Sequence, residues 1–292
     1  MKNVRMMLLM TVGALAGGLL LTAACQQMQV DRPPNTAGVQ DKDLPSLKKQ
    51  LIANSSAFYS LRADCEALLR TPLVTSPPEL RMRGELLIAK PRKIYLKLSD
   101  AGMVFIKLIG NGKEYVVKMP IYSQECSGEY DEPLMPVSGR VHFLPDDMAD
   151  AMDVGPVLAS KIQVLKSYPR RWEILPGAED KPIVYPATWA IDSTVLTKAP
   201  ESAVKVANSI IIDRTTEQVL QLDKFRPDGS LRTRIWMLKA GIARSSGEVS
   251  ARVPEELLIW YPHPLEGTII RLRLTGVKLN VKVPEDAFSF DQ

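Results

Sequence analysis

Hydrophobic residues change their spacing several times along this chain of 292 residues, and each spacing predicts a different structure. An uncharged run comes first, from Met6 to Ala24. Residues 26–43 are polar, contain two adjacent prolines and show no hydrophobic period, which is typical of a flexible tether. From Leu44 onwards apolar residues recur every three or four positions, so we expect a helix that ends near Ser60.

Beyond this helix the hydrophobic spacing becomes two, the period of a β-strand with one buried face. Apolar and charged positions alternate over residues 61–69, although the Ala, Leu and Glu content of this run also allows a longer helix. Similar runs predict strands at Met82–Ile88, Ile94–Leu98, Met103–Ile109 and Tyr115–Met119. The last break between them is Asn111-Gly112, a strong hairpin signal, so we expect an antiparallel meander.

The middle of the chain keeps neither the helical spacing of three or four nor the strand spacing of two over a long stretch. Residues 120–140 contain three prolines and two glycines, which predicts a long loop. Short helices are expected at Leu144–Met152 and near Val157–Leu165. Strands then resume, at Ile183–Leu196, Ser209–Asp213, Val219–Phe225, Leu231–Leu238, Leu257–Tyr261 and Thr268–Leu274.

Composition narrows the class of protein. With 46% hydrophobic residues the chain can bury a large core, and its length suits one sizeable β domain or two small ones, of which we prefer one. The formal net charge of +4 falls to +2 when residues 1–24 are removed, because Lys2 and Arg5 leave with them. Basic and acidic residues alternate elsewhere without a recognition motif, so nothing predicts binding to nucleic acid.

Sequence signals of catalysis are missing. The only two histidines, His142 and His263, are too few for a histidine-based metal site. No GxSxG, HExxH or GxxxxGK motif occurs. The pairs Asp146-Asp147 and Glu255-Glu256 are interpreted as surface and helix-start residues. We therefore expect a protein that is not an enzyme and that holds neither a cofactor nor a metal.

The N-terminal residues have the parts of a secretion signal. Positive charge at Lys2 and Arg5 precedes the uncharged run, and the small residues Thr22-Ala23-Ala24 stand before Cys25. This arrangement resembles the lipobox of bacterial lipoproteins, with Thr22 where leucine is usual. The resemblance implies a signal peptide at residues 1–24, diacylglycerol and palmitate attached at Cys25, and a lipidated tether over residues 25–43.

Two alternatives remain for this segment. Its uncharged run is close to the roughly 18 to 20 apolar residues that cross a bilayer, and an ordinary signal cut after Ala24 would leave Cys25 a plain thiol. In Gram-negative lipoproteins Gln26, in place of aspartate, suggests sorting to the outer membrane. The favoured localisation is therefore the bacterial envelope, anchored by lipid in the outer membrane and facing the periplasm.

The cysteines fit an exported protein. If Cys25 carries lipid, Cys65 and Cys126 remain as a pair that a compartment outside the cytoplasm would allow to form a disulfide. The alternative is two separate thiols, one buried and one in a loop.

The strands over residues 84–119 suggest a family. Gly84, Leu86 and Ile88 run into Lys90-Pro91, a strand of apolar and basic residues follows, and the Asn-Gly hairpin comes next. These features are similar to the early strands of the LolA/LolB lipoprotein carrier and receptor superfamily, and residues 275–290 are similar to its closing strand. For residues 44–292 the resemblance implies a mainly β (α+β) fold, in which a strongly curved antiparallel sheet forms an unclosed β-barrel and helices cover its opening.

The same resemblance implies an apolar cavity for acyl chains, whose burial is favourable by about 25 cal/mol per Å². Inward-facing strand residues would line it, namely Met82, Leu86, Ile88, Leu96, Leu98, Val104, Ile106 and Leu108. An ordinary core is the alternative for each of them. Met103, just after the Ser99–Gly102 turn, has a place similar to the receptor's exposed apolar residue that helps lipid transfer.

We therefore expect a membrane-anchored lipoprotein that binds lipid or lipoprotein acyl chains and transfers or holds them at the cell envelope. Its partners would be the membrane, the acyl chains and a periplasmic carrier protein. The alternative is a non-enzymatic scaffold or stress sensor of the same fold that binds a protein partner. The additional segment over residues 120–180 departs from the family pattern.

Overall fold

The computed structural model of the chain describes residues 42–70, 79–130, 144–159, 162–168, 171–173, 175, 183–185, 187–196, 204–244, 250–262 and 268–291. The predictions for the signal segment, for Cys25 and for His142 and His263 lie outside these ranges. Within them, no helix has the length and apolar character needed to cross a membrane.

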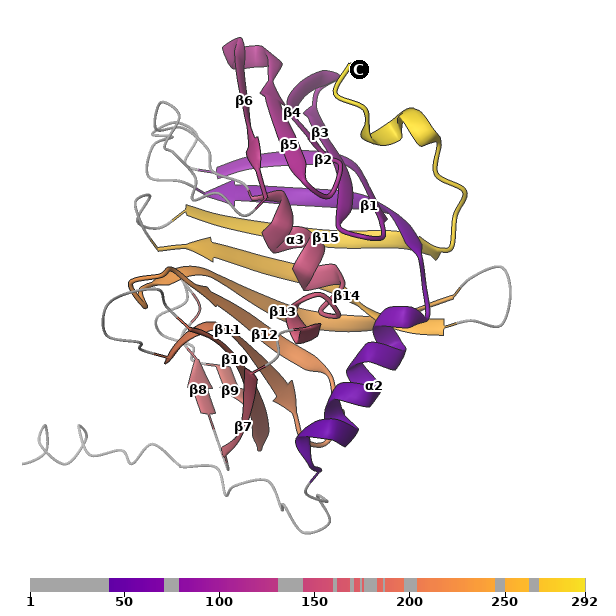
Figure 1. Ribbon diagram of the computed structural model, residues 1–292. Helices are drawn as coiled ribbons and strands as arrows, with labels where there is room; N and C mark the ends of the chain where they lie inside the picture. The colour runs from indigo at the N-terminus through magenta and orange to yellow at the C-terminus, as the bar shows by residue number, and fades with distance from the viewer. Residues whose placement is uncertain are drawn as a thin grey trace, which may run out of the picture. The chain divides into compact units, whose positions relative to one another are not determined.

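The described strands form an antiparallel sheet of thirteen strands (Figure 1). Those from the first half of the chain are β1 (Ser60–Arg70), β2 (Glu79–Ala89), β3 (Lys93–Asp100), β4 (Met103–Gly110), β5 (Glu114–Met119) and β6 (Gln124–Glu129). Those from the second half are β7 (Ile162–Tyr168), β10 (Thr188–Leu196), β11 (Val204–Asp213), β12 (Val219–Phe225), β13 (Leu231–Arg244), β14 (Ser250–Tyr261) and β15 (Thr268–Leu279). A separate two-stranded sheet pairs β8 (Arg171–Glu173) with β9 (Ile183–Tyr185).

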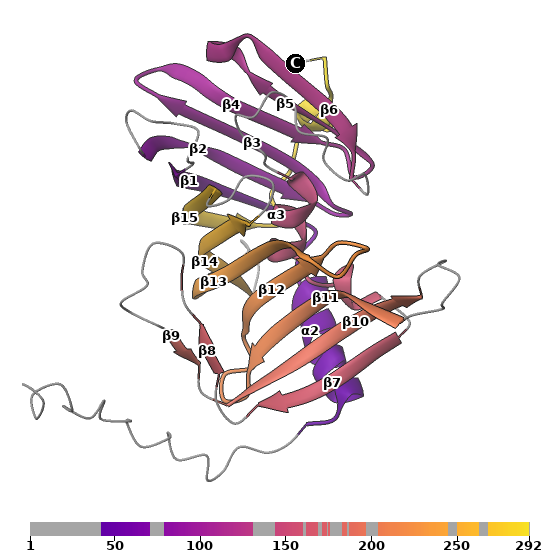
Figure 2. The ribbon, with the colours of Figure 1, turned by 90° about the vertical axis from the view of Figure 1, so that its left-hand side faces the viewer.

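The strand order shows how the two halves of the chain join. From one edge to the other it is β6-β5-β4-β3-β2-β1-β15-β14-β13-β12-β11-β10-β7, so the last strand pairs with the first. Figure 2 shows the sheet curled along this order. Because the edge strands β6 and β7 do not pair with each other among the described residues, the curled sheet is unclosed. The predicted fold class is confirmed.

Alternating burial explains why these segments are strands. In β1 the buried apolar residues are Leu61, Ala63, Cys65, Ala67 and Leu69, while the charged residues between them are exposed. Both edges of β1 are paired, with β2 on one side and β15 on the other. The period of two therefore indicated the structure correctly, and the longer helix does not form.

Two α-helices lie on the inner side of the curled sheet, where their side chains join its main apolar core. The helix α2 (Leu44–Ser56) begins after Asp43, whose carboxylate accepts a hydrogen bond from the backbone N–H of Ser46 at 3.0 Å. It ends before the predicted position because Ser60 already belongs to β1. The helix α3 (Pro145–Met152) lies where the sequence predicts it, and all of its residues are buried.

Two segments between the halves of the sheet differ from the prediction. The expected loop at 120–140 contains the 3-10 helix η1 (Pro120–Tyr122) and the strand β6. The expected helix at 157–165 is the 3-10 helix η2 (Val157–Ala159) followed by β7. Both missed strands lie at sheet edges, and their residues alternate only between exposed and half-buried positions. Edge strands of this kind lack the strong hydrophobic alternation that identifies inner strands.

Glycine is required at one position inside the sheet. A Cβ on Gly84 would overlap the backbone carbonyl of Lys97 in the paired strand β3. The turn from β4 to β5 also depends on glycine, because Gly112 has a φ of +97°. The preceding Asn111 side chain accepts a hydrogen bond from the backbone N–H of Lys113 at 2.9 Å, so the predicted hairpin is confirmed.

The C-terminal residues lie on the outer face of the sheet. Where the family resemblance suggested a closing strand over residues 275–290, β15 ends at Leu279 and the 3-10 helix η3 (Glu285–Phe288) follows. Phe288 packs with Tyr95 and Ile109 in a small apolar cluster that is separate from the main core. This segment covers part of β3 and β4 from outside.

Candidate functional site

The predicted cavity-lining residues lie mainly on the inner face of the sheet. One continuous apolar core contains seven of the eight, namely Met82, Leu86, Ile88, Leu96, Leu98, Ile106 and Leu108. Val104 is not part of this core, because the pairing of β3 with β4 shifts after Leu98 and sets Val104 opposite Ser99. The next residue, Phe105, packs against the core instead.

Helix side chains share this core with the predicted lining. Leu47 of α2 and Met148 and Met152 of α3 are buried in the same cluster. The two helices therefore fill much of the space that the curled sheet surrounds. A role of the inner strand residues in holding a ligand stays a prediction.

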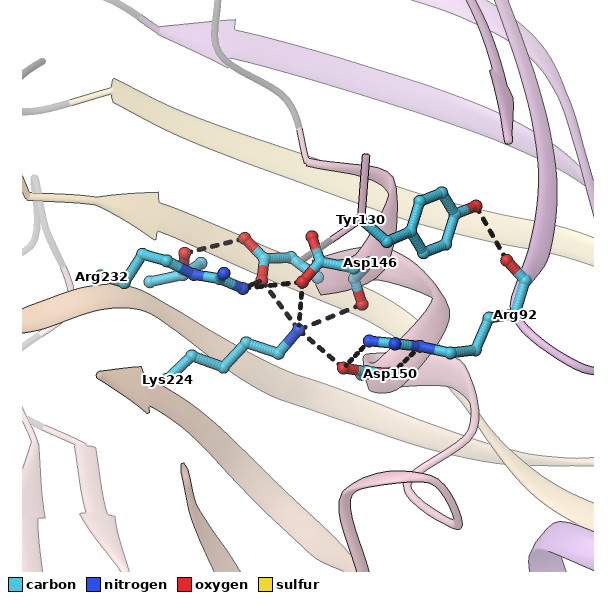
Figure 3. Close-up of polar contacts among 8 residues, drawn as sticks. Arg92, Tyr130, Asp146, Asp150, Lys224 and Arg232 are labelled. Atoms are coloured by element: carbon cyan, nitrogen blue, oxygen red, sulfur yellow. Dashed lines mark hydrogen bonds and ion pairs between the residues drawn. The ribbon is translucent and has the colours of Figure 1, made fainter. Parts of the chain in front are cut away.

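A group of charged side chains also lies on the inner side of the sheet, around α3 (Figure 3). The Lys224 ammonium group, from β12, is 3.1 Å from a carboxylate oxygen of Asp146, 3.0 Å from one of Asp147 and 2.7 Å from one of Asp150. From β13, Arg232 donates hydrogen bonds to Asp146 at 2.8 Å and to Asp147 at 2.6 Å. The first turns of α3 are thus tied to two neighbouring strands.

Arg92 reaches the same helix from the other half of the sheet, out of the turn between β2 and β3 (Figure 3). Its guanidinium group binds both carboxylate oxygens of Asp150, at 3.1 and 3.0 Å. The Tyr130 hydroxyl donates a hydrogen bond to the backbone oxygen of Arg92 at 2.8 Å. We call these three carboxylates and three cations the α3 ion cluster: Asp146, Asp147, Asp150, Arg92, Lys224 and Arg232.

Burial of the α3 ion cluster corrects the sequence interpretation. Asp146 and Asp147 do stand in the first turn of a helix, but only 3% and 0% of their surface is exposed, so they are not surface residues. Glu256 lies in β14, where it pairs with Arg271, and not at a helix start. Buried carboxylates need compensating cations, and here these cations come from distant positions that sequence spacing does not reveal.

Opposite charges shift the pKa values of Asp147 and Lys224 in the cluster. Burial alone would raise the pKa of Asp147, but the attraction of Arg232 and Lys224 outweighs it and lowers the pKa to about 2. Burial likewise opposes the charge of Lys224, yet the three aspartates raise its pKa above the usual range. Not every polar atom is satisfied, because Asp146 Oδ1 and Arg232 Nε have no hydrogen-bond partner among the described residues.

A second polar contact holds the C-terminal end of α3. The C-cap residue Asp153 forms an ion pair with Lys90 at 3.1 Å and accepts a hydrogen bond from the hydroxyl of Ser55 in α2. The Lys90 ammonium group also lies 4.3 Å from the centroid of the Phe58 ring. In the sequence Lys90-Pro91 marked the end of a strand similar to one in the carrier family, and in the structure Lys90 connects the end of β2 to both helices.

A cavity of about 360 Å³ opens beneath α2. It is bordered by α2, by the end of α3 and by parts of β13 and β14 together with the residues that lead into β12. Apolar side chains of its wall include Leu51, Met152, Val219, Met237 and Val253. None of the eight predicted lining residues borders this described cavity. The sequence missed it because its walls come from elements far apart in the chain.

Of the two alternatives for Cys65 and Cys126, the disulfide is wrong and two separate thiols are present, although Cys126 lies in the strand β6 and not in a loop. They lie on β1 and β6, with four strands between them in the sheet order. At about 4.8 Å per strand this corresponds to about 24 Å along the sheet, far more than the 4.4–6.8 Å that typically joins bridged Cα atoms. Burial raises the pKa of Cys65 to about 12, so its thiol stays protonated and unreactive at neutral pH.

Met103 lies beside the turn between β3 and β4, and 56% of its surface is exposed. This position agrees with an exposed hairpin end, while its suggested role in lipid transfer stays a prediction. Among the described residues, no group of three or more His, Cys, Asp or Glu is arranged to hold a metal ion.

The structure has the predicted fold, an unclosed, curled antiparallel sheet with helices on its inner side. One solved structure with this arrangement is an outer membrane lipoprotein-sorting protein domain from Vibrio parahaemolyticus. It is 9% identical, with a TM-score of 0.50 over 84% of this chain and 96% of that chain. Neither a family model nor a curated protein matches the sequence.

Two further solved structures are similar. A DUF1329 family protein from Desulfovibrio piger is 10% identical, with a TM-score of 0.49 over 86% of this chain and 99% of that chain. A LolA superfamily protein from Nitrosomonas europaea is 12% identical, with a TM-score of 0.47 over 84% of this chain and 98% of that chain.

The first prediction concerns the α3 ion cluster. Lys224→Met should lower the free energy of unfolding by about 3 to 5 kcal/mol, because three buried carboxylates are then left with two cations. The matched control is Lys239→Met in β13. Lys239 forms an ion pair with Glu255, and 69% of the Lys239 side chain is exposed. This control should change stability by less than about 0.5 kcal/mol. Urea unfolding of the full-length protein in mild detergent measures both, and equal effects would contradict the role of the cluster.

The second prediction concerns acid. The pKa of Asp147 is about 2 in the folded protein and about 3.9 in an unfolded chain. Its stabilising contribution is therefore complete above about pH 4 and is lost as the pH falls towards 2, which amounts to about 2 kcal/mol. Asp147→Asn should lower the free energy of unfolding at pH 7. It should also make this free energy fall less steeply below pH 4, as measured by urea unfolding from pH 2 to 7. Asp100→Asn, at the β3–β4 turn, should leave the decline unchanged, and an unchanged decline in Asp147→Asn would refute the assignment.

Proposed function

We propose that this chain is a bacterial cell-envelope protein that binds lipid or lipoprotein acyl chains in the space between its curled sheet and α2. The observation that carries this proposal is the cavity of about 360 Å³ beneath α2. Its volume falls within the roughly 300–1,000 Å³ of typical small-molecule sites. The fold shared with a lipoprotein-sorting domain supports the same function.

The chemistry of the cavity suits an acyl chain. Its apolar wall would gain stability from covering methylene groups, at about 25 cal/mol per Å² of apolar surface removed from water. Met152 and Met237 face the cavity from different elements, and flexible thioether side chains adapt to chains of different shape. Binding of this kind needs directional contacts only at the polar end of the ligand.

The wall formed by α2 is attached to the sheet by polar contacts at the cavity. The Asn54 side chain donates a hydrogen bond to the Arg252 backbone oxygen at 3.0 Å and accepts one from the Arg252 backbone N–H at 2.8 Å. The Gln50 side chain donates a further hydrogen bond to Glu217. These contacts hold the helix beside the cavity without filling it, and they offer polar groups for the end of a bound chain.

The location proposed for this activity is the outer membrane. A signal peptide over residues 1–24 and lipid at Cys25 would tether the domain through residues 25–43, with its cavity on the periplasmic side. The domain would then exchange acyl chains with a periplasmic carrier, or hold them, without covalent chemistry. A scaffold or stress sensor that binds a protein partner is the second candidate, and the helix-filled inner core favours it.

The test of acyl binding uses cells that express the full-length chain and are fed a diazirine-labelled palmitic acid. After irradiation, peptide mapping should find the label on the segments that contain Met152 and Met237, which distinguishes it from acyl groups attached at the N-terminus. Ala53→Trp should reduce this labelling by about tenfold, because the exposed Ala53 borders the cavity and the indole would block entry.

The matched control is Ile52→Trp, one residue away on α2, where the side chain is 42% exposed and does not border this described cavity. Labelling should then stay within about twofold of the original chain. If the original chain carries no label at the cavity, acyl binding there is refuted and the scaffold or sensor gains support.

A separate test addresses the anchor. Cys25→Ala should move the protein from the membrane fraction to the soluble fraction after cell lysis, because several acyl chains anchor a protein far more firmly than a short apolar contact. Cys65→Ala and Cys126→Ala remove the two free thiols of the sheet and should leave the protein in the membrane fraction. Membrane retention of Cys25→Ala would show that lipid at this residue is not the anchor.

A further inference from the structure

The outer face of the sheet carries a hollow of about 640 Å³ over β1, β2 and β15, beside the turn between β3 and β4. Four arginines border it: Arg81 and Arg83 from β2, and Arg271 and Arg273 from β15. Each is exposed and alternates with buried residues, so all four point away from the apolar core. We call this feature the arginine hollow.

Strand pairing explains why the arginines surround a gap. Between β2 and β15 runs β1, whose Glu66 is opposite Arg83 on one side and Arg273 on the other. Two residues further along β1, Leu68 is opposite Arg81 and Arg271. The arginines of β2 and those of β15 are therefore two strand spacings apart, which is about 10 Å between their backbones. Long guanidinium side chains on both sides can reach one ligand placed over β1.

Local carboxylates neutralise only part of this charge. Arg83 forms an ion pair with Glu66 at 3.1 Å, and Arg271 pairs with Glu256. The side chains of Arg81 and Arg273, at diagonal corners of the hollow, form no ion pair or hydrogen bond with any other described residue. Four arginines face two bordering carboxylates, Glu66 and Asp100, and the Glu256 carboxylate that pairs with Arg271 is a third, so one positive charge is left over. The hollow therefore has an excess of positive charge.

We infer that the arginine hollow is a binding site for a phosphate-bearing anion. Guanidinium groups present planar pairs of N–H donors that match phosphate oxygens, and a group held by two arginines gains charge-assisted hydrogen bonds from both. Leu68 and Glu66 of β1 form the floor between the arginines, and the Glu66 carboxylate is already paired with Arg83. The phosphate belongs either to the headgroup of an anionic lipid or to a soluble compound. The site lies on the face opposite the α2 cavity, so it does not depend on acyl binding there.

The experiment titrates the full-length protein in dodecyl maltoside with two probes, sodium pyrophosphate and phosphatidylglycerol in mixed micelles, and follows binding by microscale thermophoresis. We expect saturable binding of at least one probe. Binding of pyrophosphate identifies a soluble phosphate as sufficient, whereas binding of phosphatidylglycerol alone identifies a lipid headgroup. Either result supports the site, provided that the variants below behave as stated.

The decisive variant is Arg81→Gln combined with Arg273→Gln, which removes the two arginines without ion pairs and so leaves the contacts of the fold in place. It should weaken binding by at least about tenfold. The control combines Lys113→Gln with Lys278→Gln, two exposed lysines outside the hollow, and changes the net charge by the same amount. The control should bind within about twofold of the original protein. Absence of binding to both probes, or equal weakening in variant and control, would overturn the inference.

Discussion

The arrangement of this domain depends on the electrostatic balance around α3. Three carboxylates on one short helix can be buried only if cations accompany them, because an unpaired charge away from water costs several kcal/mol. Lys224 and Arg232 come from one half of the sheet and Arg92 from the other, so the same helix joins both halves. The helix N-terminus adds a favourable partial positive charge near Asp146 and Asp147. Burial of α3 therefore requires the sheet to curl, so that cations from both of its halves reach the same three carboxylates.

The buried position of α3 also determines where the interior has space for a ligand. The inner strand residues that the sequence assigned to a cavity face α3 and α2, whereas the space of about 360 Å³ lies at the far end of α3, beneath α2. Met152 at the end of α3 borders that space, and Asp153 next to it is held by Lys90 and Ser55. A ligand too long for the cavity would have to displace these groups. Under the proposed function, these polar contacts would limit how far an acyl chain enters the cavity.

Much of the fold followed from local sequence, and the site did not. The alternation in β1 and the Asn111-Gly112 hairpin were recognised because each depends on neighbouring residues alone. The edge strands β6 and β7 were missed because they contain no fully buried residues, so their sequences lack a clear alternation of apolar and polar positions. The burial of Asp147 depends on Lys224 and Arg232, which are remote in sequence and bring no local signal. The separation of Cys65 from Cys126 likewise follows from strand order, which spacing between cysteines does not encode.

The alternation that builds the sheet also separates the arginine hollow from the apolar core. Ala67 faces the core, while Glu66 and Leu68 on either side of it face the arginine hollow, so successive residues of β1 serve different faces. A substitution of an outward residue changes the charge of the hollow and leaves the apolar core intact, whereas an inward substitution does the reverse. Shifting the register of β1 by one residue would exchange both faces at once. Pairing on both edges of β1 fixes this register, and with it the chemical character of each face.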